Sequence, residues 1–85
     1  QRLTVLPGTA TAQELERLVG DGGTVVVMKL SQCADEVQRC IRLHPEYTYH
    51  YFENVGTPAE FYTCDAATVV SRHFPYFSLM IVQRQ

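Results

Sequence analysis

Thr24-Val25-Val26-Val27-Met28-Lys29-Leu30 is the stretch of the chain that decides the fold. A nearly continuous apolar run that is rich in β-branched residues, and that follows two glycines, is typical of a strand covered on both faces. Such strands lie in the middle of a sheet that has helices on both sides. We therefore expect an α/β domain built around this strand.

Helices are predicted on either side of the strand along the chain. Thr11 and Glu14 have the spacing of a capping box, and the apolar stripe that follows them ends at Gly20-Asp21-Gly22-Gly23. After the strand, Ser31 is predicted to cap a second helix, which Pro45 ends. The central strand is therefore expected to be linked to its neighbours through helices.

Further strands are predicted over residues 2–6, 59–64 and 76–82, with a short helix over 66–73 that Asp65 caps. The stretch 46–55 is ambiguous. Its tyrosines alternate with polar residues as in a strand, but their spacing also fits a helical stripe, and the helix is the interpretation that we prefer. The order of elements predicts a single domain over residues 1–85, with about four strands and three helices in a mixed or parallel-containing sheet.

The composition excludes several classes of function. Hydrophobic residues make up 46% of the chain, which is enough for a core. The net charge is −2 and the seven basic residues are scattered, so we expect no binding of nucleic acid. No apolar run approaches the about 20 residues that cross a bilayer, so no membrane association is expected. Three cysteines, an odd number, indicate reduced thiols and an intracellular, most simply cytoplasmic, protein.

The sequence resembles the thioredoxin superfamily in the order of its elements. Val25-Val26-Val27 followed by Ser31-Gln32-Cys33-Ala34-Asp35-Glu36 is similar to the family's central strand and active-site helix. Phe61-Tyr62-Thr63-Cys64-Asp65 and Phe74-Pro75-Tyr76-Phe77 are similar to its later strand and to the cis-proline that leads into an apolar strand. The resemblance implies a thioredoxin-like βαβαβαβ fold with Cys33 in the place of the nucleophile.

Differences from the family suggest a function without dithiol chemistry. Glu36 stands where the second active-site cysteine is expected, and Gln32 replaces the usual tryptophan. The last strand and helix of the family have no counterpart after Val82, which should leave an edge strand exposed. The resemblance therefore implies a non-dithiol thioredoxin-like adaptor that binds a protein partner, or a second copy of itself, inside a larger assembly. Gln32, Phe74, Pro75 and Tyr76 are the predicted partner-binding residues.

A monothiol disulfide oxidoreductase is the first alternative. A cysteine at a helix N-terminus feels the positive end of the helix dipole, which lowers its pKa and would make Cys33 the nucleophile. The acidic residues Asp35 and Glu36 oppose that effect. The competing interpretation is that Cys33 is a small buried residue. Pro75 has two interpretations as well: a cis-proline beside the thiol, or a trans-proline that starts a strand.

A peptide-binding hub is the second alternative. His73-Phe74-Pro75-Tyr76-Phe77-Ser78-Leu79 is similar to the core strand of small dynein light chains, which are dimers that capture a peptide as an added strand. That resemblance implies an antiparallel sheet and a dimer. Cys33, Cys40 and His44 share a helical face, but their spacing is too long for a structural zinc site, so neither a metal nor another cofactor is predicted.

Overall fold

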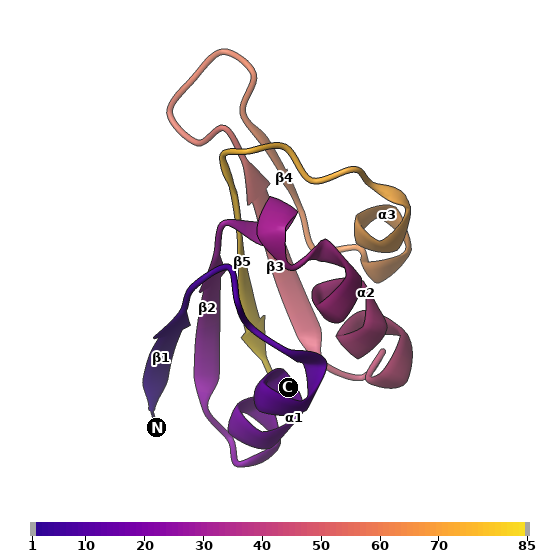
Figure 1. The fold of residues 1–85 in the computed structure, drawn as a ribbon. Coiled ribbons are helices and arrows are strands. Elements are labelled where there is room, and N and C mark those ends of the chain that lie inside the picture. The colour runs from indigo at the N-terminus through magenta and orange to yellow at the C-terminus, as the bar shows by residue number, and fades with distance from the viewer. Residues whose placement is uncertain (1, 85) are drawn as a thin grey trace.

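The computed structural model describes residues 2–84, which form a five-stranded sheet with three α-helices and one short 3₁₀ turn (Figure 1). Along the chain the elements are β1 (Leu3–Leu6), α1 (Ala12–Gly20), β2 (Thr24–Met28), the 3₁₀ turn η1 (Leu30–Gln32), α2 (Ala34–Leu43), β3 (Thr48–Glu53), β4 (Phe61–Thr63), α3 (Ala66–Ser71) and β5 (Ser78–Gln83).

The sheet is mixed, and its strand order is β1-β2-β5-β3-β4. β1 and β2 run parallel and are joined through α1, while every other neighbouring pair is antiparallel. The predicted α/β class and mixed sheet are confirmed. The strand order differs from that of thioredoxins, and five strands are present where about four were predicted.

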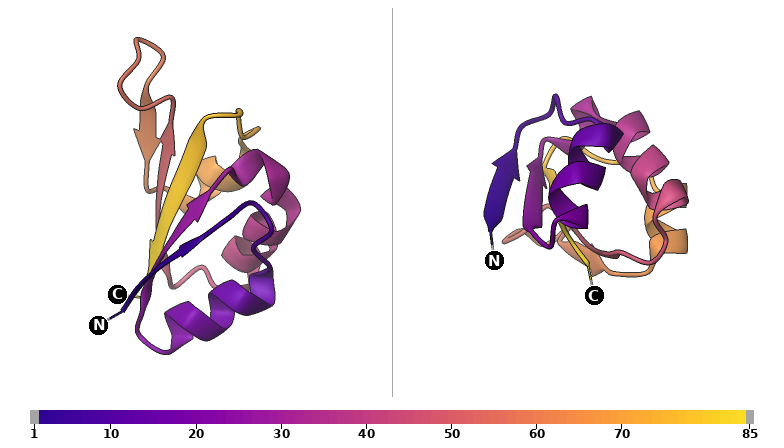
Figure 2. Two further views of the ribbon diagram at one scale, coloured as in Figure 1. Left: turned by 60° about the vertical axis from the view of Figure 1, so that its left-hand side comes forward. Right: turned by 90° about the horizontal axis from the view of Figure 1, so that it is seen from below.

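The three helices all lie on one face of the sheet (Figure 2). Val25 and Val27 point toward the helices and are buried, whereas Met28 points to the opposite side and is 39% exposed. The prediction that the central strand is covered on both faces is therefore wrong for this chain. The connections place each helix on the same side, so the second face of the sheet receives no cover from residues 2–84.

The stretch 46–55 contains a strand, β3, and the preference for a helix there was wrong. Tyr49 and Tyr51 are fully buried on the helix-covered face, and β3 pairs along its whole length with β5. The tyrosines therefore follow the period of two that is typical of a strand, because packing against the helices buries every second residue of β3. Tyr49 also donates hydrogen bonds to the carbonyls of Cys40 and His44, which fixes the end of α2 against the strand.

Capping of α1 and α3 follows the prediction, and that of α2 does not. Thr11 Oγ1 accepts from the Glu14 backbone N–H, and Asp65 Oδ2 accepts from that of Thr68. The second helix begins after Cys33 rather than after Ser31, because η1 turns the chain first and buries Leu30. Lys29 enters this turn with a φ of 53°, in the left-handed region.

The last strand, β5, lies in the middle of the sheet, between β2 and β3. The prediction that missing C-terminal elements would leave an exposed edge strand there is therefore wrong. The edge strands are β1, with four residues, and β4, with three. Both are short, which limits the backbone that they offer for pairing. The faces of the sheet therefore offer more surface for binding than its edges do.

Candidate functional site

The thiol of Cys33 is buried at the start of α2, with only 6% of the residue exposed. Burial raises the pKa of the Cys33 thiol above its ordinary value, and the nearby carboxylate of Glu36 raises it further, although a backbone hydrogen bond with Ala10 acts in the opposite direction. A raised pKa keeps the thiol protonated near neutral pH. The geometry therefore favours the interpretation of Cys33 as a packed core residue over that of a nucleophile.

The other predicted site residues are not gathered around Cys33. Cys33 and Gln32 line a shallow hollow made by residues 31–36, whereas Tyr76 lines a separate apolar hollow with Met28 and Phe52. Phe74 is buried against Tyr51, with ring centroids 5.1 Å apart, and so belongs to the core. Of the predicted partner-binding residues, Tyr76 is the one whose side chain is largely exposed beside an apolar hollow.

Pro75 follows a trans peptide bond, since no cis bond occurs between the residues that the structure describes. The carbonyl of Pro75 accepts a hydrogen bond from Ser78 Oγ, at 2.8 Å, which turns the chain into the start of β5. Of its two interpretations, the ordinary trans-proline ahead of a strand is the one found here. The proline shapes the loop that carries Tyr76 and Phe77.

The remaining thiols do not form a metal or disulfide site. Cys40 is buried with its Sγ 3.6 Å from the Tyr49 hydroxyl, and Cys64 is exposed directly after β4. Within residues 2–84, no cluster of three or more His, Cys, Asp or Glu side chains is arranged to hold a metal ion. In the same residues, no helix has the length and hydropathy needed to cross a membrane.

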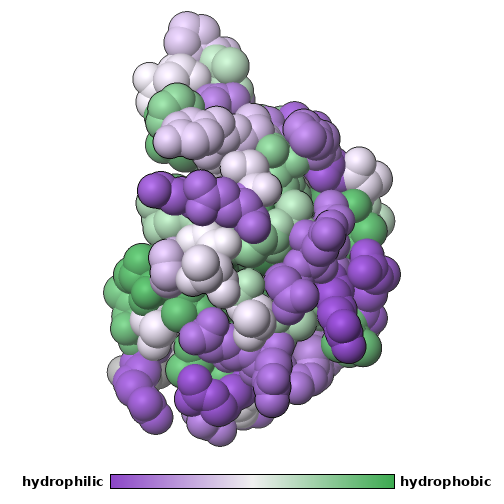
Figure 3. All heavy atoms as spheres, viewed as in Figure 1, coloured by the Kyte–Doolittle hydropathy of each residue, from purple (hydrophilic) through white to green (hydrophobic). Residues whose placement is uncertain are grey.

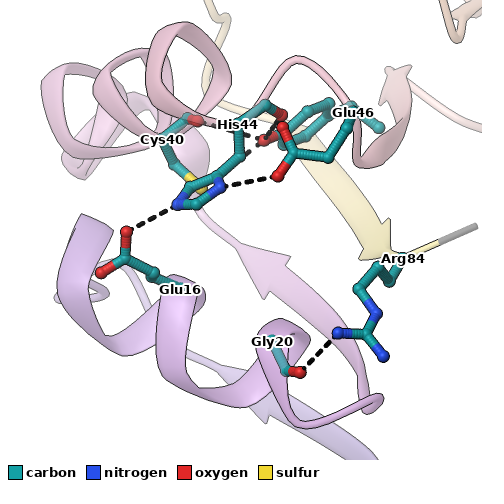
Figure 4. Close-up of polar contacts among 7 residues, drawn as sticks. Glu16, Gly20, Cys40, His44, Glu46 and Arg84 are labelled. Atoms are coloured by element: carbon teal, nitrogen blue, oxygen red, sulfur yellow. Dashed lines mark hydrogen bonds and ion pairs between the residues drawn. The ribbon is translucent and has the colours of Figure 1, made fainter.

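A polar clamp joins α1 to the end of α2 (Figure 4). His44 Nε2 lies 2.6 Å from Glu16 Oε2, and its Nδ1 lies 2.9 Å from Glu46 Oε2. The ring also stacks on Tyr47, at 4.5 Å between centroids. Hydrogen bonds to Glu16 and then to Glu46 raise the pKa of His44. With both ring nitrogens occupied by protein carboxylates, the group is suited to fastening two helices rather than to acid–base catalysis.

A second polar cluster fastens α3 to the sheet. The carboxylate of Glu53 is buried, and it accepts hydrogen bonds from Arg72 at 2.5 and 3.0 Å and from the Tyr51 hydroxyl at 2.5 Å. The Arg72 guanidinium lowers the pKa of Glu53 and also lies 3.7 Å from the centre of the Phe61 ring. Each polar group is satisfied within the fold, so this cluster serves packing.

The uncovered side of the sheet, which we call the open face, is mostly apolar and carries no charged side chain. Its side chains form three rows across the strands. The first row is Val5, Val26, Ile81 and His50, and the second is Met28, Leu79, Phe52 and Tyr62. The third row is more polar and consists of Leu3, Thr24, Gln83 and Thr48. None of these twelve residues is an Asp, Glu, Lys or Arg. His50 is the one residue of the open face with ring nitrogens, and both have a partner. Its Nδ1 lies 2.8 Å from the Tyr62 hydroxyl, and its Nε2 lies 3.4 Å from the amide of Gln83.

The open face is extended at one end by apolar side chains from two loops, with Tyr76 and Phe77 in the loop before β5 and Val55 in the loop after β3. Tyr76 and Phe77 are 64% and 69% exposed and pack edge to face, with centroids 4.8 Å apart. Together with Val55 they line the apolar hollow that reaches Met28, Phe52 and Leu79. At the opposite edge, Figure 3 shows green side chains gathered over β1, while the outward sides of α1 and α2 are mostly hydrophilic. The exposed apolar surface is therefore concentrated on one side of the molecule.

Sequence reasoning missed the open face as a site, although its signal was present. The apolar run of β2 predicts helices on both sides of the sheet, and the apolar stretch 76–82 predicts a further strand. That composition indicates burial on both faces, but it does not say that one chain supplies both covers. Tyr76 was predicted to bind a partner, and it does border the open face.

No protein-family model matches the chain, and no curated protein matches it significantly.

Proposed function

We propose that the chain is a protein-binding module, with no thiol chemistry of its own, which docks a partner protein on the open face of its sheet. One observation carries the proposal: β2 and β5 have apolar side chains on both faces, but the helices of residues 2–84 cover only one face. Soluble monomers rarely leave a large contiguous apolar surface uncovered. A bound protein would complete the burial that the strand composition calls for.

The chemistry of the surface fits this function. Exposed Tyr, Phe and Met side chains, such as Tyr76, Phe77 and Met28, supply contact area and are enriched at protein interfaces, whose centres are depleted of charge. The open face has that composition. The proposal does not depend on a relation to thioredoxins, which stays a prediction.

Neither alternative function gains the same support. A monothiol oxidoreductase needs an accessible thiolate, whereas the Cys33 thiol is buried and its pKa is raised. A hub of the dynein light chain kind needs an antiparallel sheet, whereas β1 and β2 are parallel. The open face therefore supports a docking module better than either alternative.

Photo-cross-linking tests the proposal directly. Met28→p-benzoylphenylalanine places a reactive group on the open face, and Leu43→p-benzoylphenylalanine places the same group at the exposed end of α2. After irradiation in an extract of the source cells, we expect position 28 to give a discrete protein adduct that position 43 does not give. If both positions give the same diffuse products, or none, the open face is no docking site.

A further inference from the structure

We infer that the partner on the open face is a second copy of this chain, bound face to face about a twofold axis. This inference rests on the proposed function, because it identifies the occupant of the same surface. Three features of the surface lead to it: the area that is exposed, the absence of charge, and the geometry of the sheet.

The area matches what one partner of a stable dimer contributes. Seven large apolar side chains on or beside the open face are between 39% and 70% exposed: Leu3, Val5, Met28, Val55, Tyr62, Tyr76 and Phe77. If each of these side chains had the about 150–250 Å² of an aromatic one, together they would expose on the order of 600–1,000 Å². A standard interface buries about 800 Å² on each partner. One copy therefore offers enough surface to form a stable interface with another.

The absence of charge removes the usual obstacle to self-association. A charged face would repel an identical copy and would select a partner of opposite sign. The open face carries no Asp, Glu, Lys or Arg, and in the hollow at its end the one ionic side chain is that of Lys29. The net charge of −2 is therefore carried outside the open face. Two copies can meet on this face without bringing like charges together.

The geometry of the sheet favours face-to-face packing over pairing at the edges. Both edge strands are short, at four and three residues, so few backbone groups are free for an added strand. Two sheets can pack with their faces about 10 Å apart and with their side chains interdigitated. The dimer would then have helices outside and two sheets inside, and both faces of β2 and β5 would be buried. Because the interface is isologous, each residue occurs in it twice.

Sedimentation of the purified chain tests the inference. At about 100 µM, we expect the wild type to sediment at twice the 9.7 kDa mass of the chain. The variant Val5→Glu/Met28→Glu would place four carboxylates in the interface, which should weaken the dimer at least about 100-fold. Both side chains are exposed in the single chain, so the variant should fold normally, as circular dichroism can verify.

A matched control and a rescue keep the test specific. Gln13→Glu/Leu43→Glu changes the charge equally on the helix side of the molecule and should leave the dimer intact. Mixing the Val5→Glu/Met28→Glu variant with Val5→Lys/Met28→Lys should restore a dimer of the two, because the opposite charges then face each other. The inference is overturned if the wild type is a monomer at every concentration, or if the Glu variant associates like the wild type.

The mass of the photo-cross-linked adduct separates this inference from the proposed function. An adduct from position 28 at twice the mass of the chain supports the dimer. If the adduct has a mass other than twice that of the chain, and the wild type sediments as a monomer, a different protein is bound. That result overturns the dimer but leaves the open face as a docking site. If position 28 gives no discrete adduct at all, both the inference and the proposed function are wrong.

Discussion

Replacing Val27 with alanine should destabilise the fold much more than replacing its neighbour Val26. Val27 is fully buried beneath the helices, whereas Val26 points to the open face and is partly exposed. Both substitutions remove the same two methyl groups and the same preference of a β-branched residue for strands. The difference between the two variants therefore measures how well each face of β2 is covered.

The magnitude follows from the burial. Each buried methyl or methylene group contributes about 0.8 kcal/mol, and the cavity left behind adds to that. We expect Val27→Ala to lower the free energy of unfolding by about 2–3 kcal/mol. Val26 has no helix above it, so Val26→Ala should cost roughly 1 kcal/mol or less.

Urea denaturation followed by circular dichroism provides the assay, because a domain of this size is expected to unfold in two states. Each variant is measured at two protein concentrations, so that a contribution from self-association appears as a shift of the midpoint. Equal losses for both variants at the lower concentration, with no such shift, would refute the reasoning. That result would mean that the single chain covers both faces of its sheet.

Three further predictions concern the titratable side chains. Iodoacetamide should alkylate exposed Cys64 readily at neutral pH, while Cys33 stays protected until the pH is well above the ordinary thiol range. Rapid modification of Cys33 at neutral pH would restore the oxidoreductase hypothesis. His44→Gln should lower the thermal midpoint by a few degrees near about pH 6 and have less effect at higher pH. The pKa of His44 is raised in the fold, so its stabilisation is complete below the ordinary value of 6.5 and is lost as the pH rises through the raised value; a pH-independent loss would contradict the clamp. Glu53→Gln should cost about 1–3 kcal/mol in urea unfolding, and a neutral outcome would show that the Arg72 contact does not stabilise the fold.

Local signals in the sequence predicted the elements well where short-range chemistry decides them. Thr11 and Asp65 cap their helices as their side chains suggested, and Pro45 lies just beyond the end of α2. These outcomes depend on hydrogen bonds within a few residues. In contrast, Ser31 does not cap α2, because burial of Leu30 in the preceding turn shifts the start of the helix to Cys33.

The arrangement of the elements could not be predicted in the same way. The order of strands depends on which long-range pairs form, and β5 enters the middle of the sheet, between strands that are distant in the sequence. The tyrosines of β3 fit two periodicities, and only the pairing with β5 selects one. The apolar run of β2 indicated two covered faces, but a sequence pattern cannot tell a cover supplied by the chain from one supplied by a partner.

Hydroxyl-radical footprinting of the open face tests the central claim most directly. The purified chain is oxidised at high dilution and at high concentration, and a third sample is oxidised in an extract of the source cells and then recovered. The account predicts that Met28, Tyr76 and Phe77 are strongly protected in the concentrated protein relative to the dilute protein, while exposed Leu43 on the helix side reacts equally in all samples. Protection in the extract alone would indicate a partner other than a second copy. If Met28 and the two aromatic residues react as fast in the concentrated protein and in the extract as in the dilute protein, nothing docks on the open face, and the account is contradicted.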